Sequence, residues 1–546
     1  MRGRMMDWPL LISTMIEHAA QNHADAEIVS RSVEGPMRRT TYGEISRRSK
    51  RLAHALMRKL GIGFGDRVAT LAWNGYRHVE LYYAISGIGS VCHTVNPRLF
   101  ADQLVYIFNH AADKALFLDL TFLPLVEKLA PLLKTVEHFV LMTDRAHMPA
   151  SSPLKNLLCY EELLAAEDDQ LVWPRFDEQT ASSLCYTSGT TGNPKGALFT
   201  HRSTVIHALT CCATDVFSMS AEDSVCPIVP MFHVNGWAVP YAAAMSGARL
   251  VMPGPALDGA SVANLFNEEG VTFSLGVPTV WLGLIKHMDE TGGKFRTFKR
   301  MLVGGSAIAP SLVEAFQKKY GVNVRHGWGM TEMSPVGTTG TLKRKHMGLS
   351  EDEQIQVQLK QGRALWGVEM KIVDAEGKRL PHDGTAQGEL LVRGPGIVSG
   401  YFNDDQASKA ALDEEGWFRT GDVGTIDPDG YLQITDRRKD VIKSGGEWIS
   451  SIDIENLAIG HPDIQEAAVI GLPHRKWGER PFLIAVPKEG KTPTREAVIQ
   501  FISAKVAKWM VPDDVVFVRE LPHTATGKLL KTKLREDFKA HTLPDG

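Results

Sequence analysis

Phosphate-binding chemistry is indicated by one loop rich in glycines and hydroxyls, YTSGTTGNPKGALFTH, which runs from Tyr186 to His201. It follows ASSLCYT, a run with the composition of a buried strand. Glycines let backbone N–H groups approach an anion, hydroxyls donate to phosphate oxygens or help to hold magnesium, and the lysine adds a positive charge. A flexible linker would not explain the Pro-Lys-Gly ending. The candidate nucleotide-binding residues are Thr187, Ser188, Gly189, Thr190, Thr191 and Lys195.

This loop departs from the Walker pattern, because Pro194 stands where the second glycine belongs. A simple NTPase is therefore disfavoured.

Two further stretches carry carboxylates in settings that suit a nucleotide. In GWGMTE, Trp328 offers an aromatic face for adenine, and Thr331 and Glu332 supply oxygen ligands for magnesium or an α-phosphate. Burial in a core explains Trp328 equally well, since tryptophans are usually buried. Asp422, in RTGDVG, has the paired acceptors that two ribose hydroxyls need, although an aspartate that stabilises a turn is the commoner case.

Two basic side chains have ordinary explanations beside functional ones. His233, in PMFHVNGW, follows an apolar strand, where a histidine is more often a hydrogen-bonded core residue than a ligand. Lys528, in TATGKLLK, lies among basic neighbours that fit a solvated charged face. Its Thr-x-x-Gly-Lys turn favours a functional lysine.

The elements that must position these residues begin with an α/β pattern. From Arg67, short β-branched runs alternate with helical spacing, which predicts a βαβ series and a parallel sheet with helices on both faces. A second series begins with ASSLCYT and continues through SVCPIV, ARLVMP, VTFSLG and KRMLVGG. Ligands of such sheets collect at loops beyond the carboxyl ends of the strands.

The pattern changes in the last third of the chain. After about Gly362, strands punctuated by Gly and Asp predict a small antiparallel barrel or sheet, and from Arg437 a compact α+β pattern follows. The charged segment TDRRKD suits a hinge between them. We therefore predict an α/β fold with a large N-terminal domain, residues 1–436, of two layered α/β subdomains plus a small β-barrel. A small, mobile α+β C-terminal domain is expected over residues 437–546.

Composition limits the partners and the compartment. A chain of 546 residues implies at least two domains, and its hydrophobic fraction of 44% and charged fraction of 23% are those of a globular protein. The net charge of -3 gives no overall attraction to nucleic acid or an anionic membrane, so we expect small-molecule partners. Six cysteines without paired spacing suit a reducing compartment. We read no signal peptide and no membrane-spanning run, and expect a cytoplasmic enzyme.

Seven stretches, in order and spacing, resemble the motifs of the adenylate-forming superfamily, which includes acyl-CoA synthetases, luciferase and peptide-synthetase adenylation domains. Besides the loop at Tyr186 they are PMFHVNGW, GWGMTE, GELLVRGPGIVSGYF, GWFRTGDVG, DRRKDVIKSGGEWIS and PHTATGK. The likeness covers nearly the whole chain. HVNGW, GWGMTEMSP and SGGEWISS most resemble bacterial medium- and long-chain fatty-acid CoA ligases, including a group that activates 3-methylthiopropionate.

The resemblance implies a role for each matched residue. The catalytic residues would be Lys528, Glu332, Thr331 and His233, with Lys528 stabilising carboxylate and phosphate oxygens during adenylation. Thr187 and Glu332 would contact magnesium, and Asp422 and Arg437 would bind the ribose. Further nucleotide-binding residues would be Gly305, Ser306, His326, Gly327 and Trp328, of which Trp328 replaces a tyrosine common in the family. The acyl pocket would contain His233, Val234, Trp237, Gly305 and Pro335, with Trp237 as a gate.

The implied activity is that of a fatty-acid CoA ligase that uses ATP, magnesium and coenzyme A. A carboxylate attacks the α-phosphate to give acyl-AMP and pyrophosphate, and the CoA thiol then displaces AMP. The family alternates these steps by rotating the small domain about a hinge, here Lys439, where other members have aspartate. Lys528 then leaves the site and a CoA-facing segment enters, with Lys443, Ser444, Gly445, Gly446 and Trp448. A homodimer is expected by the same resemblance.

Four alternatives compete with a medium-chain fatty acid ligase. A 3-methylthiopropionate CoA ligase shares the same motifs. An amino-acid adenylating enzyme needs an acid for the substrate ammonium, yet no Asp or Glu occurs between Asp223 and Asp258, and no carrier module is present. A luciferase-like oxygenase shares the motifs but is the rarer chemistry. A catalytically dead binder would be expected to lack Lys528 or Glu332.

Overall fold

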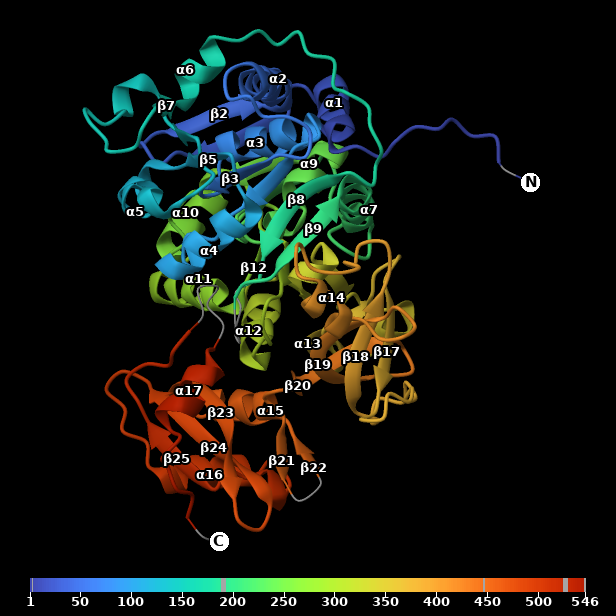
Figure 1. Cartoon of the computed structure of the whole chain (residues 1–546). Coiled ribbons are helices and arrows are strands. Elements are labelled where there is room, and N and C mark those ends of the chain that lie inside the picture. Colours follow the sequence, from blue (N-terminus) through green and yellow to red (C-terminus); the bar gives the residue numbers. More distant parts are fainter. Residues whose placement is uncertain (2, 188–192, 445–446, 524–528, 545–546) are drawn as a thin grey trace.

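The phosphate-loop candidate lies in the first of three sheets. The computed structural model describes residues 1, 3–187, 193–444, 447–523 and 529–544 (Figure 1). Its seven-stranded sheet has the order β7-β6-β5-β3-β4-β8-β9. The strands are β3 (Arg67–Leu71), β4 (Val91–Thr94), β5 (Ala115–Leu118), β6 (His138–Leu141), β7 (Leu157–Cys159), β8 (Ala181–Tyr186) and β9 (Gly196–Thr200). All neighbours are parallel except β8 and β9, which confirms the predicted βαβ series.

One strand assignment was wrong. ASSLCYT was predicted to open the second series, but it forms β8, which pairs in parallel with β4 in the first sheet, Thr94 opposite Cys185. Its inner residues are buried, so its composition identifies a strand without identifying its neighbour. The phosphate-loop candidate therefore follows the carboxyl end of a strand of the first sheet.

The second sheet has thirteen strands in the order β17-β18-β19-β20-β16-β15-β14-β13-β12-β10-β11-β1-β2. Its α/β part contains β1 (Glu27–Arg31), β2 (Met37–Thr41), β10 (Ser224–Pro227), β11 (Arg249–Met252), β12 (Phe273–Gly276), β13 (Arg300–Val303) and β14 (Asn323–Gly329). All its pairs are parallel except β1 with β2. The predicted runs from SVCPIV to KRMLVGG are thus confirmed as neighbouring parallel strands.

The antiparallel region continues the same sheet beyond β14. It contains β15 (Val336–Thr339), β16 (Gly362–Ala364), β17 (Glu369–Val373), β18 (Gly388–Arg393), β19 (Phe418–Ile426) and β20 (Tyr431–Arg437). Its strands pair antiparallel throughout. The third region predicted from glycine and aspartate punctuation is therefore joined to the α/β part through hydrogen-bonded strands.

Helices cover the two sheets and pack between them. They are α1 (Ile12–Asn22), α2 (Tyr42–Arg58), α3 (Tyr76–Gly87), α4 (Ala101–Ala111), α5 (Leu123–Leu129), α6 (Tyr160–Ala165), α7 (His201–Cys212), α9 (Val239–Ser246), α10 (Gly259–Glu268), α11 (Pro278–Thr291), α12 (Pro310–Glu314), α13 (Glu351–Leu359) and α14 (Asp405–Ala411). The largest core cluster joins α1, α2, α3, α7 and α9, so the two α/β layers share one core.

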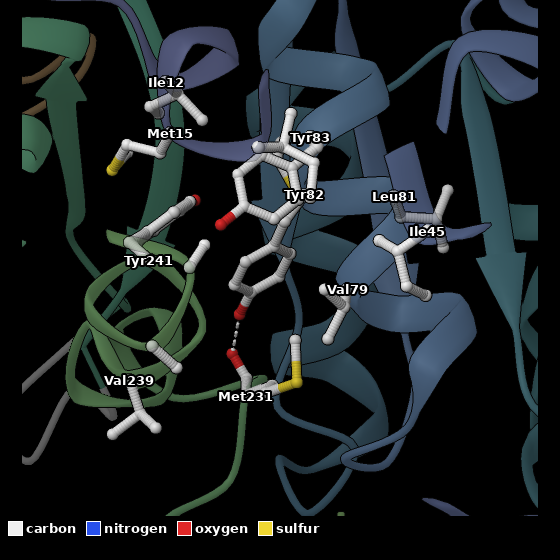
Figure 2. Packing of buried hydrophobic residues seen from close by; sticks show 14 of the residues in the cluster. Ile12, Met15, Ile45, Val79, Leu81, Tyr82, Tyr83, Met231, Val239 and Tyr241 are labelled. Atoms are coloured by element: carbon white, nitrogen blue, oxygen red, sulfur yellow. Dashed lines mark hydrogen bonds between the residues drawn. The ribbon is translucent and has the colours of Figure 1, made fainter. Parts of the chain in front are cut away.

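Figure 2 shows where this shared core meets the segment before the acyl-pocket candidates. Tyr82 and Tyr83 of α3 pack beside Tyr241 of α9, and the Tyr82 hydroxyl donates to the Met231 carbonyl. The side chain of Asn74 accepts from the Met231 N–H at 2.6 Å and donates to the carbonyls of residues 227 and 229. Side chains of the first layer therefore hold this segment of the second.

The C-terminal part has a sheet and cores of its own. Its strands are β21 (Ile442–Ser444), β22 (Glu447–Ile449), β23 (Ile464–His474), β24 (Gly478–Pro487) and β25 (Asp514–Phe517), and its helices are α15 (Ser451–Ile459), α16 (Arg495–Ser503) and α17 (Lys531–Asp537). Two apolar clusters stabilise it, formed only by residues after 440. The predicted α+β pattern is confirmed. Among the described residues, no helix combines the length and apolarity needed to cross a bilayer.

Candidate active site

The phosphate-loop candidate is closed at its base by two hydrogen bonds between Thr187 and Lys195. Between β8 and β9, the N–H of Thr187 donates to the Lys195 carbonyl at 2.9 Å, and the N–H of Lys195 lies 3.3 Å from the Thr187 hydroxyl oxygen. The antiparallel pairing of Tyr186 with Gly196 brings the two ends of the loop together. Ser188, Gly189, Thr190 and Thr191 lie outside the described residues.

The exposed Lys195 and the buried Glu332 are linked through a residue that the sequence analysis did not single out. The Tyr401 hydroxyl donates to Oε1 of Glu332 at 2.7 Å, and the Lys195 ammonium lies 5.0 Å from the centre of the Tyr401 ring. The surrounding segment is fixed at both ends, because Val398 N–H donates to the Glu332 carbonyl and Phe402 N–H to the Gly196 carbonyl. Tyr401 belongs to GELLVRGPGIVSGYF, which was recognised as a motif without a role for this tyrosine.

Glu332 lies in an environment that opposes its negative charge. Its side chain belongs to the short helix Thr331–Met333, and the residue is 5% exposed. Burial raises the pKa of Glu332, while the Tyr401 hydrogen bond and the positive charges of Arg437 and Lys195 act in the opposite direction. A further cation at this carboxylate would relieve the cost of its burial.

A second contact network connects Trp328, Asp422 and Arg437. The Trp328 indole N–H donates to one Asp422 oxygen at 2.7 Å, and the Arg437 Nε lies 2.7 Å from the other. Asp422 and Arg437 are direct partners on β19 and β20, so their side chains meet on one face of the sheet. Both explanations of Trp328 retain support, since it packs in a core cluster with Met333 while its indole N–H contacts a site residue.

The floor of the candidate site follows the carboxyl ends of β13 and β14. Gly305 has φ +84°, a conformation that favours glycine, and the exposed Ser306 follows it. His326 is buried in β14, where its Nδ1 donates to the Leu359 carbonyl at 2.8 Å, and burial lowers its pKa. Gly327 continues β14 and leads directly to Trp328.

The acyl-pocket candidates cluster around an unusual turn. His233 is half-buried, and Val234 and Trp237 are buried in a short segment of left-handed backbone. A Cβ placed on Gly304 would lie 2.9 Å from Cη2 of Trp237, so the indole packs directly on that glycine. Pro335 is buried, and its carbonyl accepts from the Met330 N–H.

The hinge candidate falls between the second and third sheets. β20 ends at Arg437, and Lys439 lies in the turn of residues 438–440 that leads to β21. Two hydrogen bonds cross this turn: Ser450 Oγ donates to the Thr435 carbonyl, and Ser451 N–H donates to Asp436 at 2.7 Å.

The predicted CoA-facing residues lie apart from the residues above. Lys443 and Ser444 belong to β21, and Trp448 to β22, a hairpin on the side of the C-terminal part away from the N-terminal body (Figure 1). Ser444 contacts Arg480 within its own sheet. Gly445, Gly446 and Lys528 lie outside the described residues.

Comparison with known proteins shows which family has this sequence and fold. An AMP-binding enzyme model matches residues 16–402, and the model of the AMP-binding enzyme C-terminal domain matches residues 453–528. A 3-methylmercaptopropionyl-CoA ligase of Ruegeria lacuscaerulensis is 53% identical over 539 residues, 99% of either chain. A medium-chain-fatty-acid–CoA ligase of Ectopseudomonas oleovorans is 50% identical over 538 residues, 98% of either chain.

A solved structure shares the fold over the same length. The anthranilate CoA ligase AuaEII, in complex with anthranoyl-AMP, matches with a TM-score of 0.86 and 25% identity over 98% of both chains. The chain therefore belongs to the AMP-binding, adenylate-forming enzyme family, and within it to the acyl-CoA ligases, which are AMP-forming acid–thiol ligases that use ATP.

Proposed function

We propose that the chain activates a medium-chain or similarly apolar carboxylic acid in two steps at one site. In the first step a carboxylate oxygen bonds to the α-phosphorus of ATP and the bond to pyrophosphate breaks. In the second step the thiol sulfur of CoA bonds to the acyl carbon, AMP leaves with the bonding pair of its oxygen, and the thiol loses its proton.

The observation that carries this proposal is that Arg437 pairs with Asp422 and also acts electrostatically on the buried Glu332. It pairs with Asp422, whose second oxygen is held by Trp328, and its charge also favours the ionised form of Glu332. An oriented carboxylate beside an aromatic side chain suits a ribose and its base. A second, buried carboxylate close by suits the cation that accompanies the phosphates.

The donor set also fits magnesium delivered with ATP. No group of three or more His, Cys, Asp or Glu side chains in the described part of the chain forms a metal cluster. Magnesium needs none here, because it binds through one or two carboxylates, waters and the substrate phosphates. Glu332 and the Thr187 hydroxyl would hold it, and it would neutralise phosphate charge. Lys195 adds a positive charge, and Lys528 is assigned to the reacting carboxylate by its motif.

The acyl end is assigned from the wall that surrounds Trp237. The stretch from Met231 to Met245 contains no formally charged residue, and most of its side chains are buried. Such a wall favours a neutral tail and disfavours a second carboxylate or an ammonium group, which would be buried without a partner. The 53% identical relative supports 3-methylthiopropionate as a second candidate, since this short thioether is also an apolar acid.

Domain rotation would exchange the groups that face the site. In Figure 1 the hairpin of Lys443 and Ser444 lies away from the N-terminal body, whereas α17, which starts three residues after Lys528, lies nearer to it. This supports assigning the described orientation to adenylation. Rotation about the turn at Lys439 would bring Lys443, Ser444 and Trp448 toward CoA for the second step.

The test is a panel of acids assayed for both nucleotide and acyl products. Straight-chain acids, 3-methylthiopropionate, a dicarboxylate and an amino acid are each incubated with MgATP, with and without CoA. We expect AMP, pyrophosphate and acyl-CoA, with the best turnover for an uncharged tail. Glu332→Gln should abolish pyrophosphate release. Release of ADP and orthophosphate, or a preference for the charged tails, would overturn the proposal.

A further inference from the structure

The segment from Val234 to Ala238 has a backbone that most of its residues disfavour. Five successive residues have positive φ, namely Val234 (45°), Asn235 (54°), Gly236 (60°), Trp237 (54°) and Ala238 (63°). Only glycine adopts this region freely, asparagine tolerates it, and a β-branched valine there is a genuine outlier. Such a turn persists only where its surroundings hold it in place.

Buried contacts to β8 and β9 hold this turn. Asn235 is 6% exposed, and its Nδ2 donates to the Ser183 hydroxyl at 2.9 Å while its Oδ1 lies 3.6 Å from the Cys185 thiol. Ser183 and Cys185 are two residues apart on β8 and therefore point to the same face. Val234 packs in one small cluster with Cys185, Ala197 and Phe199, which are residues of β8 and β9. These contacts hold the turn against β8 and β9, the two strands on either side of the phosphate-loop candidate.

The position of the Trp237 side chain depends on these contacts of the turn. It lies two residues after Asn235 on the same turn, and its indole packs on Gly304, with Cη2 at 2.9 Å from the Cβ that glycine lacks. Gly304 therefore limits displacement of the ring on one side, and the turn fixes the backbone from which the ring extends. Loss of the Asn235 contact would leave the turn free to relax and move the ring.

We propose that Asn235 is a positioning residue that determines acyl-chain specificity: its carboxamide, bonded to Ser183, fixes Trp237 against Gly304 and so limits the tail that the pocket accepts. This rests on the proposed function, in which the acyl tail meets Trp237.

The choice of asparagine follows from two demands at one position. The backbone there is left-handed, which excludes most side chains, and the buried surroundings offer a hydroxyl and a thiol that need a side-chain donor and acceptor. Glycine meets the first demand only. Aspartate would place a negative charge in a buried position, which is costly unless the charge is paired.

The test compares Ser183→Ala, Asn235→Gly and the double variant. Ser183→Ala removes the hydroxyl from β8 without changing the turn, whereas Asn235→Gly removes the carboxamide and keeps a left-handed backbone accessible. For each protein, kcat/KM is measured with decanoate and with 3-methylthiopropionate. We expect the ratio of the two to rise about fivefold in each single variant, the effect of one lost hydrogen bond. The double variant should show no further rise, because both changes break one contact.

A purely structural role would give a different result. Ser30→Ala is the matched control, because it removes a buried strand hydroxyl that accepts from the Tyr76 N–H at 3.0 Å, outside the proposed pocket. It should leave the decanoate ratio unchanged. If the Ser183 and Asn235 variants lose activity equally toward both acids, or if the double variant shows the product of the single effects, the proposal is wrong.

A binding measurement distinguishes a failure of the proposed function from a failure of the role proposed for Asn235. The affinities of the decanoyl and 3-methylthiopropionyl sulfamoyl-adenosines are compared for the same proteins, and this needs no turnover. A wild-type protein that forms no acyl-CoA would overturn the proposed function, yet a fivefold shift in these relative affinities would still support the role of Asn235. An unchanged affinity ratio would overturn it.

Discussion

Trp328→Phe tests how much the hydrogen bond between Trp328 and Asp422 contributes to the proposed nucleotide site. The change keeps an aromatic face but removes the indole N–H that lies 2.7 Å from the Asp422 carboxylate. Hydrogen bonds to charged groups contribute about 1.5–3 kcal/mol, and each 1.4 kcal/mol is about tenfold in an equilibrium. Since Arg437 still holds the other oxygen, we take the lower end of this range. KM for ATP should rise about tenfold in pyrophosphate exchange.

Trp328→Phe in an Asp422→Ala background tests whether loss of the Trp328–Asp422 hydrogen bond causes the rise in KM for ATP. Without the carboxylate the indole has no acceptor to orient, so Trp328→Phe should then change KM for ATP by less than about twofold. Thermal unfolding of all four proteins measures the separate cost of the smaller ring. A Trp328→Phe protein with reduced thermal stability and an unchanged KM for ATP would refute the reasoning and leave Trp328 as a core residue.

Three further changes test other parts of the structure. Burial raises the pKa of Asp119 to about 7 from 3.8, so the folded protein retains a proton that the unfolded chain loses in this window. Stability should therefore fall as pH rises from about 4 to about 7, and urea titrations of Asp119→Asn should lack that fall. Gly304→Ala should displace Trp237 and lower kcat/KM for the preferred acid about tenfold, the effect of moderate overpacking, and an unchanged chain-length profile would contradict the contact. Asp436→Ala removes the acceptor for Ser451 N–H across the proposed hinge, so acyl-AMP formation should slow about tenfold while thioester formation from supplied acyl-AMP is spared. Equal losses in the two assays would argue against an orientation-specific contact.

Much of the fold could be predicted because its strands are short, buried and separated by helical spacing. Apart from their first arginine, runs such as RVATL and RMLV are buried on both faces, as strands of a parallel sheet covered by helices must be. The pairing partner of each strand in the sheet is harder to predict than the strand itself, because it depends on packing between residues far apart in the sequence. For this reason β8 was assigned to the wrong series, although the run 181–187 predicted a strand and the structure has one over Ala181–Tyr186.

The candidate site was predictable where its chemistry is local. The residues from Trp328 to Glu332 lie close together along one segment, and Asp422 lies between glycines in a recognisable motif. The contacts that orient these groups are not local. Trp328 reaches across 94 positions to Asp422, and Tyr401 across 69 positions to Glu332. No spacing rule in a single sequence links such pairs, so Tyr401 was read as part of a motif without a role.

Asn235 shows this limit of the sequence more clearly, because the local sequence pattern around it is misleading. In HVNGWAVP the sequence has an asparagine beside a glycine, an ordinary turn signal, with a valine before it and a tryptophan after it, both of which disfavour positive φ. Contacts with Ser183 and Cys185, about fifty positions earlier, help to hold the turn through all of these residues. Because β8 continues directly into the phosphate-loop candidate, the same strand supports both the nucleotide-binding candidates and the wall of the proposed acyl pocket. A substitution at Ser183 should therefore change acid selectivity more than it changes ATP affinity, since Ser183 contacts the turn, whereas the loop begins only at Tyr186.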